Sequence, residues 1–382
     1  MKSFEKVLLV GTFLAGSCAV AVADETVGQP AAPVTENAAA PEASAPEKSD
    51  FNFTAYVDVS AFSLSDTGLF TSGVPTRVFD RQRGNAFDLQ TVDLTASFLP
   101  KEGFGGLVNL NFGRDADVIG PFRTSLTDKF DVQAAYAQYA TGPFTVLAGK
   151  FVTLSGAEVI KSTADTNFSR SILFGYAIPF THTGARVVYA FNDKTTFTVG
   201  VNRGWDVALD DNNNDETLEL GASFVPIDPL AVLVSFYSGK ELGSTGINGS
   251  RNLIDLVGTY TVNDALSLVL NFDYAHQTDA IGPGSDATWD GVAGYVNYKL
   301  NDKWHVSLRG EYFDDSDGFR TGVTQQWKEA TATLAYLPFD FLELRAEVRG
   351  DWSNVNSFLK NDGGTKDNES SVGIEALFKY GS

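Results

Sequence analysis

The sequence predicts an all-β fold, a transmembrane antiparallel up-and-down β-barrel of about 16 strands. Three observations predict it: polar and apolar side chains alternate, the alternating segments are long enough to cross a membrane, and short connections alternate with long ones. Segment 341–352 shows the alternation most clearly, because its odd positions from Glu343 to Asp351 are all charged while its even positions are apolar or glycine. Successive side chains of a strand point to opposite faces, so this segment has one polar face and one apolar face.

The first 23 residues are predicted to be a secretory signal peptide. Two lysines precede an apolar run over 7–20, and residues 21–23 form an A-x-A cleavage site. Cys18 leaves a lipoprotein signal as an alternative, although residues 15–17 lack the large aliphatic side chain expected three positions before the cysteine. Cleavage after Ala23 removes the only cysteine, so we expect neither disulfides nor thiolate metal sites in the mature chain.

Residues 24–50 are predicted to be a disordered tether, because this Ala-, Pro- and Glu-rich segment has too few large apolar side chains to offset the entropy of ordering. The whole chain has a formal net charge of −20, and removal of two lysines and one glutamate with the signal peptide makes it −21. Such acidity argues against nucleic acid as a partner. After residue 24 there is no apolar run of about 18 residues, so a chain that crosses a membrane must do so as a barrel.

From residue 51 to the C-terminus the alternating segments come in pairs. Each has about 9 to 15 residues, and eleven residues rising about 3.3 Å each at a tilt near 45° cover the roughly 25 Å apolar band of an outer membrane. Seven short connections alternate with eight long ones, as in outer-membrane barrels with short periplasmic turns and long external loops. The predicted strands span residues 51–63, 85–99, 104–114, 129–140, 144–152, 183–191, 195–205, 216–225, 230–240, 251–262, 265–276, 288–300, 304–314, 328–337, 341–352 and 368–380.

Closure of sixteen strands decides which face is inside. The interior of such a barrel is too wide for wall side chains to fill, so the polar faces should line water and the apolar faces should meet lipid, with every strand edge paired. Aromatic residues near strand ends are expected to form girdles at the two membrane interfaces. These aromatic residues are Phe98, Trp205, Trp304, Phe341, Trp352 and Tyr380.

The polar face of each predicted strand supplies candidate pore-lining residues of both charges. Opposite charges on facing walls orient hydrated solutes and set ion preference, whereas the alternative is that these charges only pair along the wall as solvated salt bridges of little energetic weight. The candidates are Asp58, Asp88, Lys150, Arg186, Arg309, Glu311, Glu343, Arg345, Glu347 and Arg349, and the same faces also carry Glu219, Asp255 and Asp273.

The longest connection, 153–183, is predicted to fold into the lumen as a constriction loop, because long loops without a strand pattern are usually functional. An outward surface loop is the alternative. Apolar residues 172–174 would seat the loop against the wall, while Glu158 and Asp165 would face the arginines. The charged candidates of the constriction loop are Glu158, Lys161, Asp165 and Arg170.

Neither a metal centre nor an enzyme is indicated. In the acidic loop 206–216, Asp210, Asp211 and Asp215 offer oxygens suited to a hard cation, but the EF-hand spacing is absent, which favours a solvated external loop that could touch divalent ions bridging lipopolysaccharide. His182, His276 and His305 have no metal-ligand spacing, and no acid–base constellation accompanies them. We therefore expect no catalytic residues and no cofactor.

Three motifs resemble the β-barrel porin-2 family over roughly residues 50 to 382. They are the segment 175–184, the strand end 149–151 and Gly204-Trp205-Asp206 before an Asp/Asn-rich loop. The resemblance implies a Gram-negative outer-membrane barrel that acts as a diffusion channel, although Gly381 and Ser382 follow Tyr380 where many such barrels end on an aromatic residue.

The predicted function is a porin, a water-filled channel for passive diffusion of small hydrophilic solutes and ions. One alternative is a substrate-selective channel or ligand-binding barrel for an oligosaccharide or an anion, and another is a non-conducting structural barrel. The expected partners are outer-membrane lipid and lipopolysaccharide, the solutes themselves and, by analogy with general porins, two further copies of the chain in a homotrimer.

Overall fold

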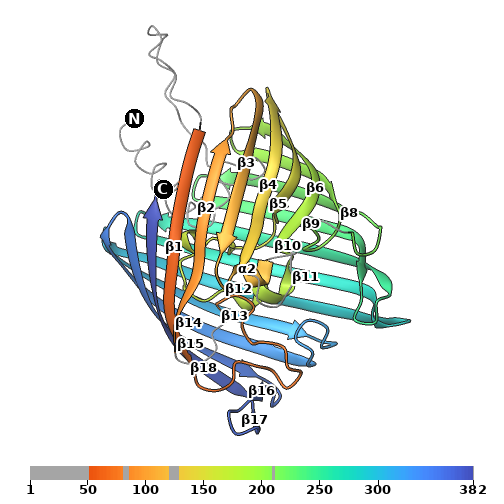
Figure 1. The fold of residues 1–382 in the computed structure, drawn as a ribbon, viewed down its shortest axis with the longest axis vertical. Coiled ribbons are helices and arrows are strands. Elements are labelled where there is room, and N and C mark those ends of the chain that lie inside the picture. Colours follow the sequence, from red (N-terminus) through yellow and green to blue (C-terminus); the bar gives the residue numbers. More distant parts are fainter. Residues whose placement is uncertain (1–50, 81–85, 120–128, 209–210, 382) are drawn as a thin grey trace.

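The computed structural model describes residues 51–80, 86–119, 129–208 and 211–381 (Figure 1). The predicted signal peptide over 1–23 and the predicted tether over 24–50 lie outside the described residues, as does Asp210 of the acidic loop.

The described residues form a closed barrel of sixteen antiparallel strands, which confirms the predicted fold class (Figure 1). Strand β1 (Phe51–Leu64) pairs with both β2 (Ala86–Phe98) and the C-terminal β18 (Asn368–Tyr380), and this double pairing closes the barrel. The remaining strands follow one another in chain order: β3 (Gly103–Phe112), β4 (Phe130–Thr141), β5 (Phe144–Val152), β6 (Thr181–Asn192), β7 (Thr195–Asn202), β8 (Thr217–Ile227), β9 (Leu230–Leu242), β10 (Asn248–Asn263), β11 (Leu266–Gly282), β12 (Ser285–Asn301), β13 (Trp304–Asp315), β14 (Gln325–Phe339) and β15 (Leu342–Ser353).

Side-chain burial follows the alternation of the sequence. In β15, Glu347 is 3% exposed, whereas its neighbour Val348 is 55% exposed on the opposite face. Because a barrel strand has one face toward the lumen and one toward the surroundings, the charged face of β15 lies inside and the apolar face lies outside. The outer face of a membrane barrel meets hydrocarbon, which is where exposed apolar side chains are stable.

The connections differ in length between the two ends of the barrel, with one exception. The predicted loop between β11 and β12 is wrong in extent, because these strands continue past the expected ends and only residues 283–284 separate them. Gly284 has φ +70° and its N–H group bonds to the Asp279 carboxylate, so the chain reverses in a tight turn. The glycine- and proline-containing stretch is therefore the tip of a long hairpin.

Among the described residues, helical structure is limited to single turns: α2 (Ala116–Ile119), the 3₁₀ turn η1 (Ser162–Ala164) and the π turn η2 (Leu173–Ala177). Strands β16 (Phe358–Leu359) and β17 (Thr365–Lys366) form a small separate hairpin. Within the described ranges, no helix has the length and apolar character that a membrane-spanning helix needs.

The interior of the barrel contains an apolar cluster on one side. Inward-facing Trp289, Phe313 and Trp327, from β12, β13 and β14, belong to the same cluster as Leu173 and Phe174 of the connection between β5 and β6. The expectation that polar side chains line the whole lumen is therefore wrong for this wall. Its apolar side chains are covered by the incoming connection and not by water, so their burial is favourable.

Five of the six aromatic residues expected in the girdles face outward, and their position at a membrane interface stays a prediction. Phe98, Trp304, Phe341, Trp352 and Tyr380 have exposed side chains. Trp205 is a correction, because its side chain is only 7% exposed. It follows the end of β7, where Gly204 with φ +109° turns the chain and the Trp205 N–H group bonds to Glu241, so the indole points inward.

Candidate functional site

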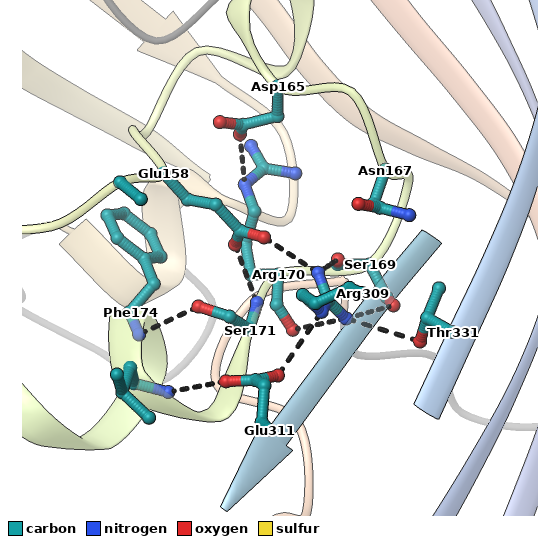
Figure 2. Close-up of polar contacts among 12 residues, drawn as sticks. Glu158, Asp165, Asn167, Ser169, Arg170, Ser171, Phe174, Arg309, Glu311 and Thr331 are labelled. Carbon is teal, nitrogen blue, oxygen red and sulfur yellow. Dashed lines mark hydrogen bonds and ion pairs between the residues drawn. The ribbon is translucent and has the colours of Figure 1, made fainter. Parts of the chain in front are cut away.

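The connection between β5 and β6, residues 153–180, is held inside the barrel by the charged faces of β13 and β15. Figure 2 shows Arg309 of β13 at the centre of these contacts. Its guanidinium lies 2.7 Å from the Glu158 carboxylate and donates to the main-chain oxygen of Ser169 at 2.5 Å. On the wall side, Arg309 forms ion pairs with Glu311 at 3.2 Å and Glu329 at 2.9 Å. One buried guanidinium therefore joins the connection to the wall.

Two wall carboxylates accept main-chain N–H groups of the same connection. Glu311 accepts from Ile172 at 3.0 Å and Leu173 at 3.1 Å. Glu347 accepts from Phe168 at 2.7 Å and from Ser169 at 3.0 Å. Because an irregular buried segment has main-chain donors that no strand partner satisfies, these carboxylates replace the missing acceptors.

Two further wall arginines donate to main-chain oxygens. Arg345 bonds to Asp165 at 2.7 Å and to Ser162 at 3.1 Å, and Arg349 bonds to Arg170 at 2.7 Å. Each also has a carboxylate partner on the wall. The wall arginines and carboxylates thus bond to opposite kinds of main-chain group along one segment.

The connection also contacts β1 and β2, which follow β15 and β18 around the closed barrel. The Ser162 hydroxyl donates to Asp58 of β1 at 2.7 Å, and the Lys161 ammonium donates to Thr95 of β2 at 3.0 Å. At its two ends, Ala157 N–H bonds to Asn271 of β11 and Trp289 of β12 donates to the Ala177 oxygen. Residues 153–180 therefore lie across the lumen with contacts on several walls, and we call them the inner loop.

Arg170 links the inner loop to the connection between β1 and β2. Its guanidinium forms ion pairs with Asp80 at 3.2 Å and with Asp165 at 3.0 Å. Burial raises the pKa of Asp165 to about 8, and the Arg170 charge beside it opposes that rise. Glu158 faces a wall arginine as expected, whereas the Asp165 carboxylate contacts the arginine of its own loop.

The remaining candidate residues form ion pairs with the wall or with the connections beside it. Lys150 pairs with Asp131 of the adjacent strand at 3.0 Å. Arg186 pairs with Glu219 at 2.6 Å. Asp88 pairs with Arg114 at 2.5 Å. Glu343 pairs with Arg345 at 2.7 Å. These charges pair along the wall, as the alternative expects, but the Lys150–Asp131 and Arg186–Glu219 pairs are buried and not solvated.

Several residues of the site were missed by the sequence analysis. Glu329 and Glu375 lie on the polar faces of β14 and β18, so the same alternation could have selected them. Tyr237 donates to Glu219 and lies 2.9 Å from the Leu154 N–H group, but an aromatic residue on a strand carries no signal for a polar contact. Asp80 has no pattern that could have identified it. In the part of the chain that the structure describes, no three metal-ligating side chains come together.

Comparisons with known proteins agree on the architecture. The family described as "Putative beta-barrel porin-2, OmpL-like" matches residues 50–380. Among solved structures, the outer membrane channel DcaP of Acinetobacter baumannii is 14% identical, with a TM-score of 0.60 over 86% of this chain and 97% of that one. An anion-selective porin from Comamonas acidovorans is 10% identical, with a TM-score of 0.62 over 86% and 99%.

The trimer form of OmpT from Vibrio cholerae is 13% identical, with a TM-score of 0.59 over 86% of this chain and 99% of that one. No curated protein matches the sequence. At such identities the structural likeness describes the fold, and the family match carries the classification.

Proposed function

This chain belongs to the beta-barrel porin-2, OmpL-like family, and we propose that it forms a water-filled outer-membrane channel for passive diffusion of small hydrophilic solutes and ions. The observation that carries the proposal is the inner loop, which crosses the lumen of a closed barrel and is bonded to its walls by buried charges. A barrel used only as a structural element has no need of a segment that narrows its interior.

The distribution of side chains suggests where solutes pass. Apolar residues of the inner loop pack against β11 and β12, whereas the inward faces of β2 to β4 carry polar side chains such as Asp93, Asn109 and Gln133. A hydrated solute keeps more of its hydrogen bonds along a polar wall. We therefore propose that solutes pass along these strands, beside the contact of Lys161 with Thr95.

The charged candidates then have two roles. Arg309, Glu311, Arg345 and Glu347 position the inner loop, while Lys150 and Lys161 set the field along the path. Charges at the narrowest point decide ion preference more than net charge does.

Planar bilayer recording tests the function. We expect discrete conductance steps from the wild-type chain and a larger step after deletion of residues 156–172, because the deletion removes the segment that occupies the lumen. Deletion of 361–364, in the exposed β16–β17 hairpin, is the control and should leave the step size unchanged. Equal conductance of wild type and the 156–172 deletion would contradict the proposal that the inner loop is a constriction. A wild-type barrel without conductance would contradict the proposal that the protein is a channel.

We also propose export with removal of residues 1–23, so that residues 24–50 form an N-terminal tether on an outer-membrane protein. The intact mass of the protein purified from outer membranes should correspond to a chain starting at Asp24. A lipid-modified chain starting at Cys18 would support the lipoprotein alternative instead.

A homotrimer is the proposed assembly. A shallow depression on the barrel surface includes the small residues Ala96, Gly106, Ala137 and Ala148 of four adjacent strands, and small outward residues allow close approach of a second copy. Ala137→Arg should dissociate the trimer, as measured by light scattering in detergent. Ala346→Arg, on the outer face of β15, is the matched control, and equal masses of the two variants would contradict this interface.

A further inference from the structure

Aromatic rings and arginines gather at the end of the barrel where the long connections lie. Trp205 follows β7, Trp289 lies on β12 and Phe319 lies between β13 and β14. The two indoles meet edge to face with centroids 6.2 Å apart, and the Phe319 ring lies 5.7 Å from that of Trp289. Arg251 of β10 and Arg320 of the β13–β14 connection complete this cluster.

Both guanidiniums lie over the same two indoles. Arg251 is 4.7 Å from the Trp205 centroid and 5.9 Å from that of Trp289. Arg320 is 5.7 Å and 5.2 Å from the same two centroids. The attraction of each cation to the rings holds two like charges close together.

Neither guanidinium has an ion-pair partner among the described residues, in contrast to the arginines that hold the inner loop. Arg251 donates through Nε to Gln277 at 2.7 Å, and Arg320 donates through Nε to the Tyr176 main-chain oxygen. Their terminal Nη atoms have no acceptor in the described part of the chain, and they are not enclosed. Arg251 is nevertheless 93% buried, as its 7% exposed fraction shows.

Nearby carboxylates are already bonded to main-chain donors. Glu241 accepts the Trp205 N–H group at 3.0 Å, Asp206 accepts that of Phe180 at 2.7 Å, and Asp315 accepts that of Thr321 at 2.7 Å. These carboxylates reduce the local positive charge but accept no hydrogen bond from the terminal Nη atoms of Arg251 or Arg320. Two forks therefore keep free donors at the same place.

We propose that Arg251 and Arg320 form a binding site for the oxyanion of a small solute, either a carboxylate or a phosphate, at the outer mouth of the channel. An oxyanion accepts charge-assisted hydrogen bonds from planar guanidinium forks and relieves the repulsion between them. The indoles keep both forks in place before the solute arrives, which lowers the entropic cost of binding. The inference deepens the proposed function by naming a solute class, and it rests on that function only for transport of the bound solute.

Tryptophan fluorescence of the full-length protein in detergent tests binding directly, because two of its five tryptophans contact the proposed site. Inorganic phosphate and acetate are titrated separately at constant ionic strength. We expect a saturable change with at least one probe and an apparent Kd that rises about tenfold or more in Arg251→Gln and in Arg320→Gln, since each loses hydrogen bonds to a charged group.

Lys240→Gln is the matched control, because Lys240 lies at the same end of the barrel but pairs with Asp215 at an exposed position. It should bind like wild type. Arg251→Lys keeps the charge and loses the fork, so its Kd should lie between those of wild type and Arg251→Gln, and this variant answers the question if the glutamine variant does not fold. No saturable change with either probe, or an equal Kd in all variants, would overturn the site.

Bilayer recording of the same preparations separates the two proposals. Conductance in KCl without probe binding would support the proposed channel and contradict the proposed oxyanion site. Saturable binding that is lost in the arginine variants, without conductance, would keep the site and remove the channel.

Discussion

Glu347→Ala should release the middle of the inner loop from the barrel wall. The Glu347 carboxylate accepts from Phe168 N–H at 2.7 Å, Ser169 N–H at 3.0 Å and the Thr333 hydroxyl at 2.7 Å. Phe168 and Ser169 are fully buried, so alanine leaves two main-chain donors without an acceptor in a site that water does not reach. Each orphaned donor costs about 1–3 kcal/mol, and a total near 4 kcal/mol changes the released population about a thousandfold.

Single-channel recording should then show larger current fluctuations than in wild type, and hydrogen exchange of residues 166–171 should accelerate. Val348→Ala is the control, because this neighbour lies on the outer face of the same strand and is 55% exposed. Glu347→Gln keeps one acceptor oxygen and should have a smaller effect. Unchanged current noise together with unchanged exchange in Glu347→Ala would refute the role of this carboxylate.

Three further predictions concern charge, pH and backbone conformation. Lys161→Glu should shift the reversal potential in a KCl gradient toward cation preference, and an unchanged potential would remove Lys161 from the path. Burial raises the pKa of Asp115 to about 8, so the folded state holds this proton more tightly than the unfolded chain and stability falls as the pH rises from about 4 through 8. Asp115→Asn should reduce that loss of stability, as measured by thermal unfolding at pH 5 and pH 9. An equal pH response of wild type and Asp115→Asn would contradict the prediction. Gly204→Ala should lower the melting temperature and shift tryptophan emission to the red, because φ is +109° and a Cβ would lie 2.7 Å from Glu241. Gly258→Ala is the control and should change emission little, because a Cβ there meets no neighbouring atom. Equal emission of the two variants would argue against the turn that buries Trp205.

The sequence was sufficient for the existence of the strands and for the division of each into two faces, because both depend on local alternation. In β15 the charged and apolar positions lie on opposite faces without any information from distant residues. Strand length was less predictable: glycine and proline at 282–284 indicate a turn, but they do not say how far pairing continues on either side of it. Pairing between Gln277 and Ala287 extends the hairpin instead.

The inner loop could be expected only as a long connection with charges of both signs. Alternation does not say whether a loop enters the lumen, and composition cannot choose which arginine Glu158 meets among the several on the polar faces. Contacts such as Glu347 with the Phe168 N–H group depend on the curvature of the closed barrel. That Arg309 and its neighbours line a conducting path stays a prediction.

Trp205 shows a second limit. A tryptophan near a strand end is typical of an interface anchor, but one glycine with a positive φ redirects it into the cluster with Arg251. Side-chain direction after a strand depends on a main-chain turn, which the identity of the aromatic residue does not reveal.

The wall contacts of the inner loop have a consequence for biogenesis. Phe168 bonds to a carboxylate 179 positions later, and Arg309 reaches residues about 140 positions before it. Contacts between such distant parts of a chain form late because loop closure must come first. The main-chain donors of the inner loop therefore stay hydrated until the C-terminal strands have joined the sheet. Barrel closure and narrowing of the lumen then become a single final event, and a nascent barrel that lacks β13 to β18 has neither the β1–β18 seam nor the wall contacts of the inner loop.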